Sequence, residues 1–257
     1  MRTPQPRTRA RRRVSRRVIR RRRQVAGAGL LMCCALLVMT GLRLAAALTD
    51  APTARAASIS ATRVTAPARP TPTRATGEYA RAPGGTARQG SGSLVTYRVE
   101  VETGTGQSAP AFAAAVDTTL ADPASWTGQG HWAVQRVAGN DVDLVIRLAT
   151  SATVGKVCEA AGLKDASFAS CRTGPFIMIN LDRWLQAVPE YRGDVALYRQ
   201  YVINHEVGHG LGFGHQACPG PGLPAPVMQQ QTLGLRGCLP NGWPYVAGRL
   251  VSGPATA

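Results

Sequence analysis

The stretch from His205 to His215, HEVGHGLGFGH, constrains the fold of this chain more than any other part of its sequence. It contains three of the four histidines in the 257 residues. His205 and His209 are four residues apart, so on an α-helix their side chains lie on one face, where two imidazole nitrogens can bind one metal ion. The sequence therefore predicts a helix that runs at least as far as His209.

The residues around these two histidines predict a catalytic rather than a structural metal site. Glu206 follows the first ligand and projects beside the metal, where a carboxylate can take a proton from bound water. Gly212 has no Cβ, so the chain can leave the helix in a left-handed conformation and bring His215 back as a third ligand. Three imidazoles leave one position open on a tetrahedral Zn²⁺ ion, which is typical of catalytic zinc sites.

The pattern HExxHxxGxxH resembles that of the metzincin zinc endopeptidases, and GHGLGFGH looks most like the matrixin branch. The resemblance covers only this short part of the chain. It implies an α+β zincin domain with a mixed twisted sheet, a crossover helix, an active-site helix and an irregular C-terminal part. It further implies that Met228 forms the methionine turn beneath the ligands and that residues 229–237 form part of the wall of the specificity pocket. Gln230 stands where some metzincins have a tyrosine, so no tyrosine role is implied.

The function expected from this resemblance is zinc-dependent cleavage of protein or peptide substrates, with Glu206 as general base, by a monomeric protein. One alternative is an amidase or peptidase that acts on cell-wall peptides. A second alternative is an inactive domain that zinc stabilises for binding. The presence of Glu206 argues against this second alternative, because a purely structural zinc site does not need that carboxylate.

The formal charge of +16 does not indicate a nucleic-acid partner once it is located along the chain. Residues 1–24 contain twelve arginines and no acidic residue. From Leu94 onward there are eleven basic and twelve acidic residues, a net charge of −1. The basic character belongs to the N-terminal part, so we expect no nucleic-acid binding by the catalytic domain.

The N-terminal part predicts export from the cytoplasm. Residues 1–24 are expected to form a basic disordered cytoplasmic tail, and residues 25–48 a transmembrane anchor or a signal peptide. The positive charge on the N-terminal side of the apolar run predicts that the following residues lie outside the cytoplasm. We favour a single-pass membrane protein, and the alternative is a protein secreted after cleavage near residues 45–47.

Residues 49–93 are rich in Ala, Thr, Pro, Arg and Gly, and this composition predicts a disordered linker. It contains no cysteine, so the resemblance offers no candidate for a matrixin-like latency cysteine. The metallopeptidase domain is then expected to cover residues 94–257. Strands are predicted at residues 94–102, 131–137, 142–148 and 176–181, with a crossover helix at residues 109–120. Gly193 and Asp194 are expected to start the helix that carries the ligands.

Four cysteines fall within the predicted domain and two, Cys33 and Cys34, in the apolar run. In an exported domain four cysteines are more often paired than free. Of the three possible connectivities we favour the sequential pairs, Cys158 with Cys171 and Cys218 with Cys238, on proximity alone. Free buried thiols are the alternative, and a second zinc site is disfavoured because no CxxC spacing occurs.

Overall fold

A computed structural model of the protein describes residues 75–163 and 167–256. These residues all belong to one compact unit, Pro67–Ala257. The predicted tail (residues 1–24), the predicted apolar segment (25–48) and most of the predicted linker lie outside the described residues.

The element order is that of a sheet protein whose last long helix precedes a region with little regular structure. The strands and helices are β1 (Tyr79–Arg81), β2 (Gln89–Gly90), β3 (Ser93–Glu102), α2 (Ala109–Ala121), η1 (Trp126–Gln129), β4 (Trp132–Arg136), β5 (Leu144–Ala149), α3 (Ser151–Ala160), β6 (Cys171–Thr173), β7 (Phe176–Asn180), α4 (Leu181–Gln186), η2 (Pro189–Tyr191), α5 (Val195–Gly210), η3 (Gln231–Leu233), β8 (Tyr245–Val246) and β9 (Arg249–Leu250).

A mixed seven-stranded sheet forms the framework, in the order β2-β4-β3-β5-β7-β6, with β1 paired to β3. The four strands β4, β3, β5 and β7 are parallel, while β1, β2 and β6 are antiparallel to their neighbours. Parallel neighbours need crossover connections, and α2 supplies the one between β3 and β4. The mixed sheet with its helices confirms the predicted combination of α and β structure.

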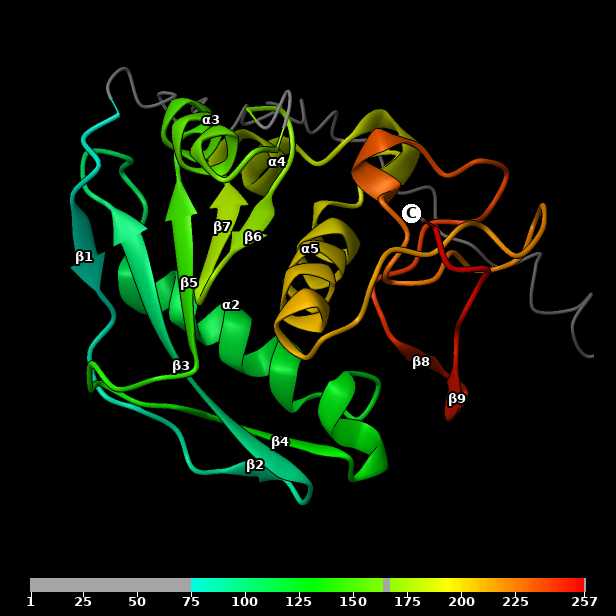
Figure 1. Cartoon of the computed structure of the whole chain (residues 1–257), viewed down its shortest axis with the longest axis horizontal. Helices are drawn as coiled ribbons and strands as arrows, with labels where there is room; N and C mark the ends of the chain where they lie inside the picture. The colour runs from blue at the N-terminus through cyan, green and yellow to red at the C-terminus, as the bar shows by residue number, and fades with distance from the viewer. Residues whose placement is uncertain (1–74, 164–166, 257) are drawn as a thin grey trace, which may run out of the picture. The chain divides into compact units, whose positions relative to one another are not determined.

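Both faces of the sheet are buried at β7, and the alternating side chains of this strand contribute to the core on each face. Ile177 and Ile179 join the main core, which the side chains of α2 and α5 complete. Met178, between them, points to the opposite face and packs with Val154 of α3. The unbroken apolar character of this strand thus reflects burial on two sides. In Figure 1, α5 lies between the sheet and the irregular C-terminal part.

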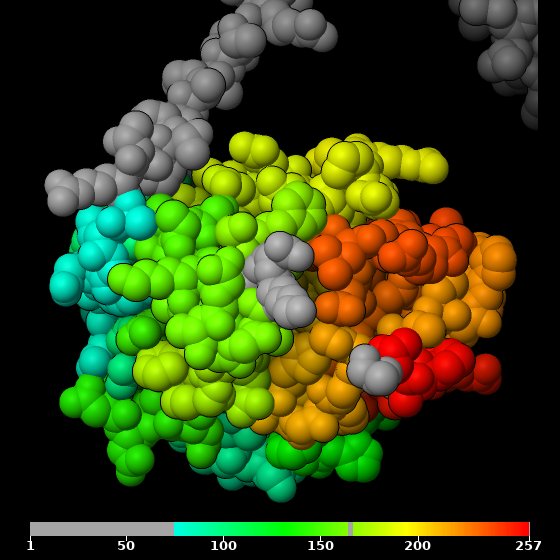
Figure 2. Space-filling model, turned by 45° about the horizontal axis from the view of Figure 1, so that its top comes forward, coloured from blue at the N-terminus to red at the C-terminus, as the bar shows by residue number. Residues whose placement is uncertain are grey.

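The chain after α5 folds back on itself without long strands or helices. Figure 2 shows this part, in orange to red, gathered on one side of the described molecule, with the sheet-bearing part in cyan to yellow on the other. Prolines at positions 219, 221, 224 and 226 remove backbone donors, so regular structure ends here. The prediction of an irregular C-terminal part is confirmed.

The predicted boundary between linker and domain is wrong, because part of the predicted linker belongs to the sheet. Residues 79–81 form β1, which pairs with the end of β3, and residues 89–90 form β2, which pairs with β4. Both strands are short and mostly exposed, so neither has the run of apolar residues that would signal a strand. Two helices, α3 and α4, were also not predicted.

The first predicted disulfide is confirmed: Cys158 of α3 is bonded to Cys171 of β6. The bond joins the helix to the antiparallel edge strand of the sheet. Cys158 is fully buried and Cys171 is 7% exposed. The edge strand is therefore held from one side by the disulfide and from the other by its pairing with β7.

The favoured localisation, a single-pass membrane protein, needs correction. Within residues 75–163 and 167–256, no helix is both long and apolar enough to cross a membrane. Residues 25–48, on which that prediction depended, lie outside these ranges. The two disulfides fit the alternative, a protein exported and released after signal cleavage, because such bonds persist in oxidising compartments.

Candidate metal centre

Helix α5 positions the first two histidines, and the turn that follows it positions the third. The helix begins at the predicted residue, since the Asp194 side chain accepts a hydrogen bond from the third residue of the helix. His205 and His209 lie in its C-terminal half. Gly212 has φ +93°, a left-handed conformation that reverses the chain and brings His215 beside the helix.

The three imidazole rings converge as the spacing predicted. The Nε2 atom of His209 lies 3.2 Å from that of His205 and 3.0 Å from that of His215. The other ring nitrogens of the two helical residues point away from this centre. Nδ1 of His205 lies 2.8 Å from the carbonyl oxygen of Val227, and Nδ1 of His209 lies 2.9 Å from that of Phe213.

These carbonyl contacts fix the protonation of the rings. A carbonyl oxygen only accepts hydrogen bonds, so the proton of each neutral ring is on Nδ1 and the lone pair is on Nε2. The Nε2 lone pairs of His205 and His209 then face each other with no proton between them. A cation between them removes this repulsion. Zn–N bonds of about 2.0–2.1 Å in a tetrahedron separate the nitrogens by roughly 3.3 Å, which is close to the observed distances.

The three histidines are in the neutral form that binds metals. Burial lowers the pKa of His205 to about 3, and the neighbouring His209 acts in the same direction. Burial also lowers the pKa values of His209 and His215. At neutral pH none of the rings must lose a proton before it can bind a cation.

Glu206 provides a buried carboxylate beside these ligands. Its side chain is 3% exposed, and its Oε2 atom has no hydrogen-bond partner among the described residues. Burial raises its pKa to about 8. Most buried carboxylates are hydrogen-bonded within the protein. An oxygen without such a partner is therefore a candidate to interact with a ligand.

The histidines and Glu206 line one cavity of about 730 Å³. One wall comes from the edge strand and the residues before it, including Ser170 and Arg172. Another part of the wall comes from Gln230, Thr232 and Leu233. These belong to the segment 229–237, which was expected to border a pocket. The three histidines therefore lie in a space large enough for part of a peptide.

Met228 lies beneath α5, where the sequence placed the candidate turn. It is 2% exposed, and a Cβ at Gly208 would collide with its sulfur atom. Its carbonyl oxygen accepts a hydrogen bond from the backbone of Gln216, 3.1 Å away, next to the third histidine. The preceding residue, Val227, supplies the carbonyl that orients His205. This short segment thus supports two of the three ligands.

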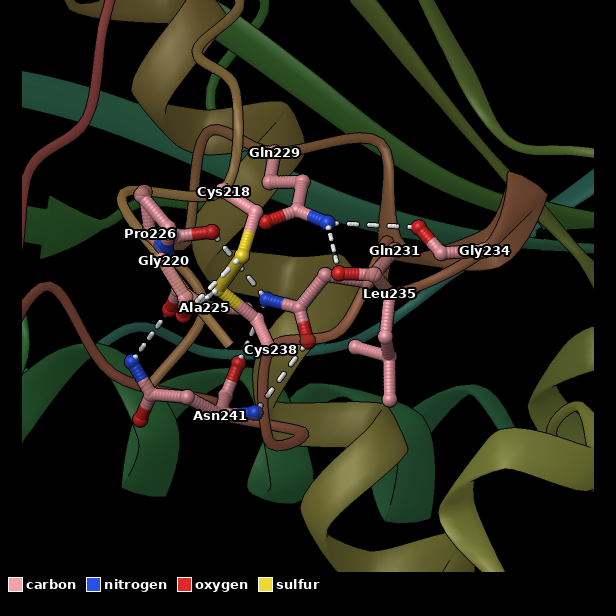
Figure 3. The surroundings of a disulfide bond; sticks show 10 residues. All are labelled: Cys218, Gly220, Ala225, Pro226, Gln229, Gln231, Gly234, Leu235, Cys238 and Asn241. Carbon is pink, nitrogen blue, oxygen red and sulfur yellow. Dashed lines mark hydrogen bonds between the residues drawn. A yellow bond between two sulfur atoms is a disulfide. The ribbon is translucent and has the colours of Figure 1, made fainter. Parts of the chain in front are cut away.

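The second predicted disulfide, between Cys218 and Cys238, is confirmed and closes the loop that contains Met228 (Figure 3). Side-chain amides in and next to this loop supply many of its hydrogen bonds. Gln229 donates to two backbone carbonyls at 2.9 and 3.2 Å, and Gln231 donates to two others at 2.8 and 3.1 Å. Asn241 donates to a further carbonyl at 2.9 Å (Figure 3). These bonds, together with the short 3-10 helix η3, fix this part of the cavity wall.

Two contributions to the site were not predicted from the sequence. Asn204, one residue before the first ligand, donates to the carbonyl of Gly242 at 2.9 Å, and its own carbonyl accepts from the Trp126 indole at 2.9 Å. These bonds join α5 to distant segments, and no local pattern signals them. Arg172 also reaches the cavity, although nothing near it in the sequence suggests a functional role.

The family model described as "Protein of unknown function (DUF3152)" matches residues 65–245. The matched region includes all three histidines, Glu206 and both disulfides. No curated protein and no solved structure matches the chain.

Proposed function

The chain belongs to the DUF3152 family, since the match covers more than half of its length, and from its candidate metal centre we propose that it is a zinc-dependent endopeptidase of the metzincin type that acts outside the cytoplasm. The observation that carries the proposal is the convergence of three Nε2 atoms beside a buried carboxylate whose Oε2 has no hydrogen-bond partner among the described residues. Both disulfides favour a location outside the cytoplasm.

His205, His209 and His215 would hold the zinc ion. When bound, Zn²⁺ acts as a Lewis acid toward the scissile carbonyl and makes water a usable nucleophile at neutral pH. Glu206 takes a proton from the attacking water at Oε2 and gives it to the nitrogen of the leaving amine. Burial raises the pKa of Glu206 to about 8, so its carboxylate is a stronger base than that of an exposed glutamate.

The carbonyls of Val227 and Phe213 act as orienting groups in this scheme. By accepting from Nδ1 they keep the Nε2 lone pairs of His205 and His209 directed at the metal position. Neither ring has to rotate or exchange a proton between turnovers. The methionine turn expected from the resemblance would have this role, with Met228 as its packing residue.

The substrate would lie as an extended peptide along β6, the edge strand that borders the cavity. β6 pairs with β7 on one side, and residues of this strand line the cavity. An extended segment can add to such an edge through backbone hydrogen bonds, which places a peptide bond near the ligands without requiring a particular sequence. This pose favours cleavage within a chain over removal of single terminal residues.

Two measurements on the purified protein test the proposal. Metal analysis after dialysis should find one zinc per chain, and His209→Ala should lose it. Casein and a peptide library should be cleaved by the wild-type protein. Glu206→Ala should retain zinc but cleave about 100- to 10,000-fold more slowly, the usual contribution of a general base.

A matched control is Glu159→Ala, which removes an exposed carboxylate from α3. It should keep both zinc and activity. If the wild-type protein holds zinc and leaves every peptide intact, the domain binds without catalysis and the endopeptidase assignment fails. If it holds no zinc at all, the metal site is refuted as well.

A further inference from the structure

Arg172 brings a positive charge to the part of the cavity wall that the structure describes. Among the described residues that line it, Arg172 is the single lysine or arginine and Glu206 the single aspartate or glutamate. Arg172 is exposed, and no carboxylate in residues 75–163 or 167–256 forms an ion pair with it. Its guanidinium therefore offers up to five donors to whatever enters the cavity.

Other arginines of the sheet behave differently. Arg98 and Arg147 each lie 2.8 Å from the Glu100 carboxylate, and Arg136 lies 3.0 Å from Asp117. These arginines stabilise the sheet and have little capacity left for a ligand. Arg172 has no such carboxylate partner among the described residues, so its guanidinium is available to a ligand in the cavity.

The backbone that carries Arg172 is held in place before any substrate arrives. The preceding residue, Cys171, is bonded to Cys158 of α3, and Arg172 itself pairs with Ile177 of β7. The strand also packs against α5, beside which it lies in Figure 1. A charge on a preorganised strand loses less entropy on binding than one on a mobile loop.

We propose that Arg172 is a specificity-determining residue that binds a carboxylate of the substrate next to the scissile bond. Guanidinium groups bind carboxylates through two parallel hydrogen bonds, which gives both affinity and orientation. The carboxylate belongs either to an acidic side chain or to the C-terminus of the substrate. This inference rests on the proposed function in one respect: it takes the cavity as the place where substrate binds.

The test uses the full-length zinc-loaded chain and an N-acetylated hexapeptide amide of alanine and leucine. Each position in turn carries aspartate in one peptide and asparagine in its counterpart, and a second series has a free C-terminal carboxylate in place of the amide. Dissociation constants are measured by calorimetry, and kcat/KM is measured wherever cleavage occurs. Calorimetry reports on Arg172 even if no peptide is cleaved, so failure of the proposed function is distinguishable from failure of this inference.

For at least one position, or for the free terminus, the wild-type protein should bind the carboxylate form about fivefold or more tightly, the order expected for a charge-assisted contact at a partly solvated site. This ratio should fall to about one in Arg172→Gln and below one in Arg172→Glu, while Arg172→Lys should retain part of it. The exposed Arg249 lies outside the cavity lining, and Arg249→Gln should keep the wild-type ratio.

The position that gives the effect identifies the source of the carboxylate. A preference at an internal position indicates an acidic side chain, and a preference for the free terminus alone indicates a C-terminal carboxylate. The inference is overturned if the wild-type protein does not discriminate at any position, if no aspartate peptide binds measurably, or if the preference survives in Arg172→Gln.

Discussion

Replacing Glu102 with glutamine should destabilise the domain strongly, because this fully buried carboxylate is a hydrogen-bond centre. Its Oε1 accepts from the backbone of Thr76 and Gly77, both at 2.8 Å, and from the Thr153 hydroxyl at 2.6 Å. Its Oε2 accepts from the backbone of Thr150 at 2.7 Å. The residue thus joins the start of the described chain to the end of β3 and to the start of α3.

The magnitude follows from what glutamine cannot do at this place. If its oxygen takes the three bonds of Oε1, its amide group faces the Thr150 N–H, so two donors meet. The unsatisfied buried N–H costs about 1–3 kcal/mol, and loss of charge at the other three bonds costs about 1 kcal/mol more. The free energy of unfolding should therefore fall by about 2–4 kcal/mol at pH 7.

The effect should also depend on pH. Burial raises the pKa of Glu102, but the hydrogen bonds from Thr153, Gly77 and Thr150 outweigh burial and hold it below its usual value. A depressed pKa in the folded state contributes stability above the unfolded pKa of about 4.3. That contribution is lost as the pH falls through the folded value, so the difference between wild type and Glu102→Gln should shrink from pH 7 toward pH 3.

Urea unfolding followed by circular dichroism measures both quantities. Glu78→Gln is the control, since Glu78 is exposed and should change stability by less than about 0.5 kcal/mol. A Glu102→Gln variant as stable as the control at pH 7, or a difference that does not change on acidification, would refute the reasoning.

Three further predictions concern the parts that hold the metal centre. Asp194→Ala removes the N-cap of α5 and should lower the free energy of unfolding by about 1 kcal/mol in urea denaturation. An unchanged denaturation midpoint would show that the cap does not stabilise the helix. Gly212→Ala places a side chain at φ +93°, so it should lower the free energy of unfolding by about 1–2 kcal/mol and weaken zinc binding, measured by competition with a chelator. The control is Gly214→Ala, at a position with open space and no positive φ, and it should change neither quantity. Replacing Cys218 and Cys238 together by alanine should cost about 3 kcal/mol in thermal unfolding under oxidising conditions, and equal stability would show that the loop is held by its amide hydrogen bonds alone.

Much of the framework could be predicted from local patterns. The strands expected at residues 94–102 and 176–181 differ by one residue at an end from β3 and β7, and the crossover helix expected at 109–120 corresponds to α2. Each has a run of apolar residues long enough to define its period. β1, β2 and β6 have two or three residues each, and they are strands because a neighbour in the sheet supplies the hydrogen bonds. A pattern that short cannot signal them.

The linker boundary was wrong for the same reason. Pairing with β3 and β4, rather than apolar composition, makes residues 79–81 and 89–90 part of the sheet. The two sequential disulfides were predicted correctly from proximity, but their structural consequences were not predicted. Cys158–Cys171 fixes the edge strand that carries Arg172, and no sequence pattern connects that arginine to the cavity.

The sequence by itself determined the candidate metal-binding set. His205 and His209 share a helix face because the helix repeat puts them there, and Gly212 allows the turn to His215 because a residue without a Cβ adopts φ +93° without strain. Those are local properties of the backbone. The tertiary structure decided what surrounds the set: the carbonyl of Val227 that fixes the His205 proton, the burial that raises the pKa of Glu206, and the strand that brings Arg172 to the cavity. These depend on contacts between segments far apart in the chain, which only the packed fold creates.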